Sequence, residues 1–226
     1  MLEILNNLMP NVMNDLARLN QSIIQTFIML FYSGIISFFI GGFLGVLLIV
    51  TKRFGIMENI IIYEVLSKLI NFFRAIPFII LLAMLVPLTR QIVGTAIGVR
   101  GAIIPLIFGT VPFFARQMES ALSEVNYGLI EAAQSMGSSP IAIIFRVYIK
   151  ESIAPIARAT TITAISLIGL TAMAGAVGAG GLGTYAIQSG YYRNKLDIIY
   201  VSVILLVILV GIIQAIGNYI VKKTTH

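Results

Sequence analysis

The sequence predicts an all-α protein that crosses a membrane several times. Of its 226 residues, 58% are hydrophobic and only 11% are charged, whereas soluble domains carry about a quarter charged residues. Several apolar stretches reach the roughly 20 residues that a helix needs to cross a bilayer. No large polar stretch remains for a separate soluble domain. A module that binds ATP or nucleic acid must then belong to another chain.

Missing residue types exclude several kinds of site. The sequence has no cysteine, and its single histidine is the last residue, His226. Disulfides, cysteine or histidine metal sites and Ser-His-Asp catalysis are therefore not expected. The net charge of +6 is typical of the basic cytoplasmic loops of a membrane protein, so no nucleic-acid partner is expected. The N-terminus lacks a basic region before an apolar core, which argues against a cleaved signal peptide.

The first predicted span covers residues 22–50 and ends at the basic pair Lys52 and Arg53. It contains Gly41 and Gly45, a GxxxG spacing that lets a neighbouring helix pack closely. This spacing alone does not identify the neighbour.

The second predicted span begins near Arg74, after an interfacial stretch. Glu64 and Lys68 in that stretch are four residues apart, a helical pair that would face water or headgroups. Pro77 lies one turn into the span and suits its start or a kink near it.

The last three predicted spans cover residues 101–115, 153–175 and 198–221. The third is only about 15 residues long, below the usual length of a span. Two prolines and a glycine interrupt it: Pro105, Gly109 and Pro112. Such breaks are used in binding or gating segments, but a kinked packing helix explains them equally well.

Five spans place the two termini on opposite sides of the membrane. With the N-terminus outside, ten of the 15 lysines and arginines face the cytoplasm: Lys52, Arg53, Lys68, Arg74, Arg116, Arg146, Lys150, Arg158, Lys222 and Lys223. The other five are Arg18, Arg90, Arg100, Arg193 and Lys195. Because cytoplasmic loops carry excess positive charge, this orientation is favoured. We therefore expect an extracytoplasmic segment 1–20, a transmembrane domain 21–221 and a cytoplasmic tail 222–226.

The polar middle of the chain, about residues 119–152, is predicted to be a cytoplasmic helix, a break and a second helix. Gly137 is placed to end the first helix, since glycine accepts the left-handed cap conformation. Ser139 is the expected N-cap of the second helix, and Pro140 its first residue. The second helix carries a predicted apolar face of Ile141, Ile144, Phe145, Tyr148 and Ile149.

The first of these helices carries Glu131, Ala132 and Ala133. Small residues allow a partner surface to approach closely, and a carboxylate can anchor it through a charge-assisted hydrogen bond. On the residues alone, an ordinary surface helix explains this composition as well as a docking helix does.

The pattern Glu131-Ala132-Ala133, followed after three residues by Gly137, resembles the EAA motif of the membrane subunits of ABC importers. That motif continues nine residues after the glycine with Ile-x-Leu-Pro. The residues at these positions here are Val147, Tyr148, Ile149 and Lys150, so Lys150 replaces the proline. The resemblance implies a type I importer fold whose Glu131–Gly137 helix docks into a groove of a cytoplasmic ATPase. Ser139 and Pro140 would complete this ATPase-coupling site.

Four segments in order are similar to the membrane subunit of methionine ABC importers: "FFRAIPFIILL", "PLTRQIVGTAIG", "GLIEAAQSMGSSP" and "AMAGAVGAGGLG". The similarity extends from about residue 20 to the C-terminus. It implies a permease in the bacterial inner membrane that forms a homodimer with two ATPase subunits and an extracytoplasmic methionine-binding protein. It also implies that ATP and Mg are bound by the ATPases, and this chain lacks the GxxxxGK[ST] phosphate loop itself.

Met173 is a candidate gate within the transport pathway. It lies among small residues that would let two copies approach, and its flexible thioether could plug a narrow opening. A packing role for Met173 explains the sequence equally well. Arg74, Arg90 and Arg100 could attract a substrate carboxylate, although snorkelling to headgroups also explains them.

Several functions remain as alternatives. The permease could carry another amino acid or a methionine derivative, and import rather than export is implied by the resemblance alone. An ion-coupled secondary carrier would require coupling acids in the apolar spans, which are almost free of them. A membrane enzyme would require a catalytic constellation, and none is visible in the sequence.

Overall fold

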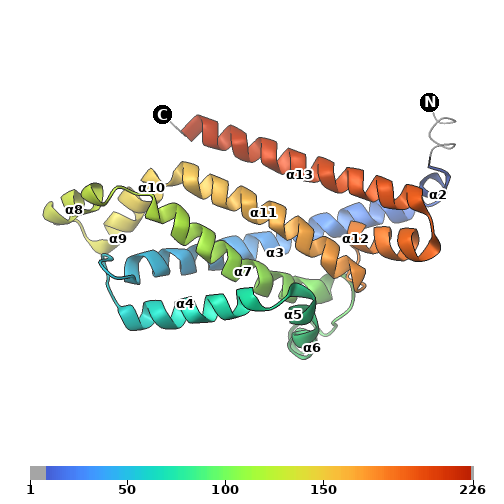
Figure 1. Cartoon of the computed structure of the whole chain (residues 1–226), viewed down its shortest axis with the longest axis horizontal. Helices are drawn as coiled ribbons and strands as arrows, with labels where there is room; N and C mark the ends of the chain where they lie inside the picture. The colour runs from blue at the N-terminus through green and yellow to red at the C-terminus, as the bar shows by residue number, and fades with distance from the viewer. Residues whose placement is uncertain (1–8, 225–226) are drawn as a thin grey trace. The chain divides into compact units, whose positions relative to one another are not determined.

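The structure is a computed structural model that describes residues 9–224, and this range contains helices but no strand (Figure 1). The chain divides into two compact units. Four long helices contribute residues to both units, and each is long and apolar enough to cross a membrane. They are α3 (Leu16–Thr51), α7 (Gly98–Ser123), α11 (Ile153–Ala176) and α13 (Leu196–Thr224). Helices are therefore confirmed at the first, third, fourth and fifth predicted spans.

The second span differs from the prediction. The interfacial stretch is a regular helix, α4 (Ile60–Ala75), and a bend of 103° separates it from α5 (Phe78–Met84). Arg74 thus lies near the end of α4 instead of at the start of a span. Pro77 causes the break, because it lacks an amide hydrogen and its ring disfavours a helical conformation at the preceding residue.

The third span is longer than predicted. The helix α7 has 26 residues and continues through Pro105 and Pro112. It extends beyond Arg100 and Arg116, the two arginines that flank the predicted residues 101–115. It also includes Glu119, which was assigned to the polar middle. The pairing of Glu119 with Arg116 explains this extension, since a neutralised carboxylate is tolerated where a free one is not.

The second unit comprises residues 36–75, 110–163 and 214–226, of which residues 225 and 226 lie outside the described range. Within it, α3 approaches α7 at Gly41 and Gly45. A Cβ atom at Gly41 would lie 3.0 Å from the carbonyl oxygen of Val111, and one at Gly45 would lie 2.8 Å from that of Ala115. The GxxxG prediction is confirmed, and its neighbour is α7.

The described part of the first unit comprises residues 9–35, 76–109 and 164–213. The small-residue run after α11 reverses the chain within it, with positive φ angles at Gly178, Gly180 and Gly181. Side chains of α3 bind the reversed backbone: the Gly181 amide donates to Gln25 Oε1 at 2.8 Å and the Leu182 amide to a threonine hydroxyl at 2.9 Å. Polar groups of a span are therefore used to satisfy irregular backbone, as an apolar surrounding requires.

Short helical segments complete the first unit. They are α2 (Pro10–Met13), α5, α6 (Val86–Val93), α12 (Gly181–Thr184), the π-helix η2 (Tyr185–Gly190) and the 3₁₀ turn η3 (Tyr191–Arg193). The segment α2 is fixed to the start of α13, because both the backbone and the side-chain amide of Asn11 donate to the carboxylate of Asp197, at 2.9 and 3.1 Å. A buried apolar cluster lies beside this pair: Val12, Leu19, Leu182, Tyr185 and Ile198.

Candidate functional site

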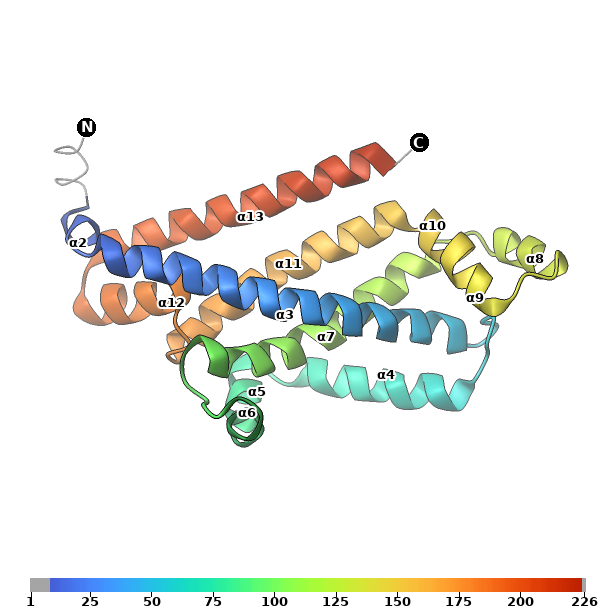
Figure 2. The ribbon, with the colours of Figure 1, turned by 180° about the vertical axis from the view of Figure 1, so that it is seen from behind.

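The polar middle forms two short helical segments at one end of the second unit (Figures 1 and 2). The first is α8 (Tyr127–Ser135). The second is continuous and comprises α9 (Pro140–Ile143), the π turn η1 (Ile144–Tyr148) and α10 (Ile149–Glu151). The segment α8 contacts both α9 and η1. The predicted helix, break and second helix are confirmed, except that the first helix begins at Tyr127 instead of at residue 119.

Asn126 sets the start of α8. Its backbone is extended, and its Oδ1 accepts a hydrogen bond from the amide of Gly128 at 2.8 Å. Asparagine is among the preferred residues at helix N-caps because its side chain satisfies an amide that has no partner within the helix. Sequence reasoning missed this boundary, and Asn126 was the signal that marked it.

Gly137 ends α8 as predicted. Its φ is 74°, and its amide donates to the carbonyl of Gln134 at 2.9 Å. The next amide, that of Ser138, donates to the carbonyl of Ala133 at 3.0 Å. These two bonds define a Schellman motif, in which the residue with positive φ is usually glycine.

Ser139 and Pro140 start the next helix, also as predicted. Ser139 has an extended backbone, and its Oγ accepts from the amide of Ala142 at 3.3 Å. Pro140 occupies the first turn, where its missing amide hydrogen costs nothing. Only two residues separate the glycine from the proline, so the angle between the two segments is set by local backbone geometry.

The residues of the EAA pattern divide between two faces of α8. Glu131 and Ala132 are exposed, whereas Ala133 is only 6% exposed and packs inside the unit. Of the two alanines, Ala132 therefore lies on the exposed face and Ala133 on the face that packs against the rest of the unit. Its small side chain lets α8 pack closely on the rest of the chain.

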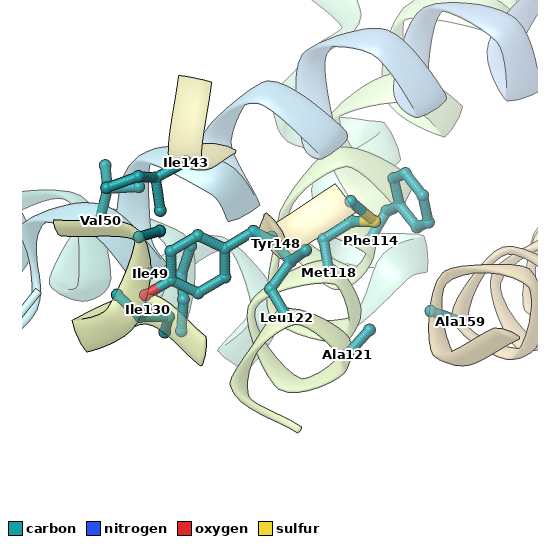
Figure 3. Close-up of a cluster of buried hydrophobic side chains, with 11 residues drawn as sticks. Ile49, Val50, Phe114, Met118, Ala121, Leu122, Ile130, Ile143, Tyr148 and Ala159 are labelled. Carbon is teal, nitrogen blue, oxygen red and sulfur yellow. The ribbon is translucent and has the colours of Figure 1, made fainter. Parts of the chain in front are cut away.

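Ala133 and Ile130 belong to a buried cluster that joins α8 to five other elements (Figure 3). The ring of Tyr148 points toward Ile49 and Ile130 in this cluster. Burial raises the pKa of the Tyr148 phenol, and the nearby Tyr127 adds to the shift, so the buried ring stays neutral. Further members come from α3, α7, α9 and α11: Val50, Phe114, Met118, Ala121, Leu122, Ile143 and Ala159. A displacement of α8 must therefore shift these neighbours or break the cluster.

The buried face of the second segment differs from the prediction. Tyr148 is buried, but Ile141 and Phe145 are 67% and 65% exposed, and Ile143 is buried in their place. The π turn explains the difference, because its wider turn brings residues five apart, such as Ile143 and Tyr148, onto one side. A helix of regular period was assumed in the prediction.

Large apolar side chains of these segments remain exposed. We call this set the coupling face: Tyr127, Leu129, Met136, Ile141 and Phe145. Glu131 and Arg146 are also exposed on the same two segments. Exposed apolar groups accompanied by charges are typical of a surface that binds another protein.

Lys150, which replaces the proline of the EAA pattern, is helical and exposed within α10. The chain leaves this segment two residues later, at Ser152, which is fully buried and interrupts the helix before α11. With lysine in place of the proline, the second segment continues to Glu151 and ends at Ser152.

Met173 lies in the last turns of α11, within the first unit, and is 40% exposed. Gly169, one turn earlier, is also exposed, and no atom lies within 4 Å of the position that a Cβ atom would occupy there. The side chains of Arg74, Arg90 and Arg100 are all exposed. Among the described residues, no group of three or more His, Cys, Asp or Glu side chains could hold a metal ion.

The helical fold and the segments α8 to α10, residues 127–151, which we call the coupling region, are those of a membrane subunit of an ABC transporter. A family model described as "Binding-protein-dependent transport system inner membrane component" matches residues 38–225. The chain belongs to this family.

Relatives of known kind are similar over most of the chain. This chain is 45% identical over 202 residues to the probable D-methionine transport system permease protein MetI of Vibrio cholerae. The aligned residues cover 89% of this chain and 90% of that protein. This chain is 43% identical over 174 residues to the methionine import system permease protein MetP of Bacillus subtilis, covering 77% and 78% of the two chains.

Solved structures agree with this assignment. A structure of the MetNI methionine ABC transporter in an inward-facing conformation matches with a TM-score of 0.91 and 45% identity, covering 93% of this chain and 98% of that one. An amino acid ABC transporter crystallised with histidines matches with a TM-score of 0.76 at 19% identity, which shows the shared fold alone.

Proposed function

We propose that this chain is the permease subunit of an ATP-driven importer that carries methionine, in the D or L form, across the bacterial inner membrane. The observation that carries the proposal is the 45% identity to a methionine permease over nearly the whole chain. The coupling region adds independent support, because a helix with a fixed exit geometry and an exposed apolar face is what an external ATPase needs in order to drive the spans.

The proposed topology has five spans, with α4 and α5 counted as one broken span. The N-terminus lies outside and the C-terminus inside, which leaves segment 1–20 extracytoplasmic and tail 222–226 cytoplasmic. The distribution of lysine and arginine supports this orientation. Residues 21–221 form the transmembrane domain, with the coupling region on its cytoplasmic side.

The proposed assembly contains two copies of this chain, two ATPase subunits and an extracytoplasmic methionine-binding protein, in contact with membrane lipid. Five spans enclose a pathway poorly, whereas ten around a two-fold axis enclose one well and match the symmetry of an ATPase pair. The similarity to the MetNI transporter supports an ATPase partner. The ATPase pair supplies the ATP and Mg, and this chain binds no cofactor.

The mechanism that we propose begins at α8. ATP binding closes the two ATPases, which carry both α8 helices with them through Glu131, Ala132 and the coupling face. Ala133 transmits the movement inward through the buried cluster, and Gly137, Ser139 and Pro140 transmit it along the chain through their fixed turn. The spans then switch between inward-open and outward-open arrangements as coupled rigid bodies.

Met173 is the proposed gate of the pathway. It lies four residues after Gly169 on α11 and four residues before Val177, which follows the end of that helix. All three residues are exposed, which leaves room for a second copy. A thioether is flexible enough to close a narrow opening and to yield when the helices separate. Replacement by alanine should open a leak for methionine in the absence of ATP. If Met173→Ala caused no leak and left ATP-driven uptake unchanged, Met173 would be a packing residue and not a gate.

Uptake of labelled L-methionine tests the proposed function. Cells that lack the gene should lose high-affinity uptake and regain it with the intact gene but not with Glu131→Lys. The matched control is Glu64→Lys, which changes an exposed carboxylate on α4 outside the coupling region. Competition with unlabelled D-methionine, methionine derivatives and other amino acids then shows which substrates the transporter binds best. Uptake that is unaffected by loss of the gene would contradict a role in methionine import.

A further inference from the structure

Two charged side chains of α7 bind one face of α4 within the second unit. Arg116 Nη1 lies 2.6 Å from Glu119 Oε2, and its Nη2 donates to the Ser67 carbonyl and to Asn71 Oδ1, each at 3.1 Å. Arg116 Nη2 also donates to the Ser67 hydroxyl. The hydroxyl of Tyr63 donates to Glu119 Oε1 at 3.3 Å. We call these five residues the α4–α7 clamp.

The α4 members of the clamp form a regular stripe. Tyr63, Ser67 and Asn71 are spaced four residues apart, so they lie along one side of α4. The guanidinium of Arg116 is a planar fork whose donors reach two directions at once, toward Glu119 on its own helix and toward α4. Such a bridge could not be made by a lysine, whose ammonium is a single point of charge.

The ion pair is largely shielded, since the Arg116 and Glu119 side chains are only 18% and 15% exposed. Both lie on α7, a helix long and apolar enough to cross a membrane. Ionisable groups in such helices are costly, and they usually mark a functional element when they are paired. The other ion pairs of the described chain, Glu64 with Lys68 and Glu124 with Arg158, involve side chains that are about half exposed or more.

The same turns of α7 are also fixed to the coupling region. Leu122, six residues after Arg116 and fully buried, belongs to the cluster that contains Ile130 and Ala133 of α8. Met118 belongs to this cluster too, and it packs where a Cβ atom of Gly45 would lie. The cytoplasmic third of α7 is thus held by α8 on one side and by the clamp to α4 on another.

We propose that Arg116 is a positioning residue for transport: it ties α4 to α7, so that displacement of the coupling region moves both helices as one body. The proposal rests on the proposed function, because it assigns Arg116 a part in ATP-driven uptake. Loss of the clamp would leave the ATPase contact on α8 intact, but α4 would no longer move together with α7. ATP would then be hydrolysed with less substrate moved.

The ratio of methionine transported to ATP hydrolysed tests the proposal in proteoliposomes that contain the complete transporter and its binding protein. Arg116→Gln and Arg116→Lys should lower this ratio by between about two-fold and thirty-fold, the range found for residues of coupling networks. The double variant Ser67→Ala with Asn71→Ala keeps the ion pair but removes the side-chain links of Arg116 to α4, and it should lower the ratio in the same direction. Lys68→Gln removes an exposed charge from α4 outside the clamp and should leave the ratio unchanged.

A distance measurement between α4 and α8 gives a readout that does not depend on the substrate. The sequence contains no cysteine, so spin labels can be attached at Ile61→Cys and Ser135→Cys, two exposed positions outside the coupling face. The distance should be narrowly distributed and equal with and without ATP, and Arg116→Gln should broaden it or make it respond to ATP. A ratio and a distance that Arg116→Gln leaves unchanged would overturn the proposal. A wild-type transporter that moves no methionine would instead contradict the proposed function.

Discussion

Gly137 adopts a φ of 74°, a conformation that costs residues with a side chain about 1–2 kcal/mol. No atom lies within 4 Å of the position that its Cβ would occupy, so backbone strain alone should oppose a larger residue. Gly137→Ala is expected to lower the stability of the coupling region by about 1 kcal/mol. Thermal unfolding of the purified permease and limited proteolysis between α8 and α9 measure this loss.

The matched control for this substitution is Gly211→Ala. Gly211 lies within α13, also with open space around it, and the same change should be neutral or stabilising by about 0.5–1 kcal/mol in a helix. Equal behaviour of the two variants would mean that the left-handed conformation at Gly137 does not matter for stability.

Ser139 contributes a single cap hydrogen bond to the segment that follows the break. Ser139→Ala should therefore cost about 1 kcal/mol, and Ser139→Asp should largely restore the cap because aspartate accepts the same amide hydrogen. Hydrogen exchange of the amides at residues 141–143 is the direct measurement. Protection that is unaffected by Ser139→Ala would show that Pro140 and the buried cluster start the segment without the serine.

At the scale of elements, the approach of α3 to α7 depends on Gly45. A methyl group there would meet the carbonyl oxygen of Ala115 at 2.8 Å and the side chain of Met118. Gly45→Ala should destabilise the second unit by about 1–3 kcal/mol through overpacking. It should also reduce ATP-driven uptake, because Met118 belongs to the buried cluster that contains Ile130 and Ala133 of α8. Thermal unfolding and uptake by the same preparations measure the two effects.

Gly42→Ala provides the control for that prediction. It lies on the same helix, and its Cβ would make an ordinary contact of 3.7 Å with the ring of Phe114. Comparable losses in the two variants would attribute the effect to glycine in α3 generally, and would contradict a specific close contact at Gly45.

Sequence reasoning succeeded for elements whose signals are local. Apolar length identified α3, α11 and α13 within a few residues at most ends, and the residues Gly137, Ser139 and Pro140 identified the break of the coupling region. In these cases the length of an apolar run or the backbone preference of a single residue determines the structure.

Sequence reasoning failed where partners distant in the sequence decide. The contact of Arg116 with α4 depends on acceptors that lie some 45–49 residues earlier in the chain. The inward orientation of Ala133 depends on the cluster beneath it, and the buried pair Ile143 and Tyr148 depends on a π turn. A regular helical period cannot reveal any of these features.

The whole molecule is a permease subunit whose transport energy comes from a separate ATPase. In the mechanism that we propose, transport energy enters through the exposed face of α8 and spreads through the buried cluster and the α4–α7 clamp. The four long candidate spans contain two acids, and both have partners: Glu119 pairs with Arg116, and Asp197 accepts two hydrogen bonds from Asn11. Neither is therefore an unpartnered acid of the kind that an ion-coupled carrier would use. Uptake by intact cells should therefore fall when ATP is depleted and persist, at constant ATP, when the proton gradient is dissipated.

ATP-driven uptake by the reconstituted transporter is the most direct test of this account. Proteoliposomes that contain the permease and its ATPase, with the binding protein outside, should accumulate labelled methionine only when ATP is enclosed. Glu131→Lys should abolish that accumulation by preventing the ATPase from engaging α8. Accumulation without ATP, or accumulation that Glu131→Lys leaves unchanged, would contradict the claim that this chain is driven through its coupling helix.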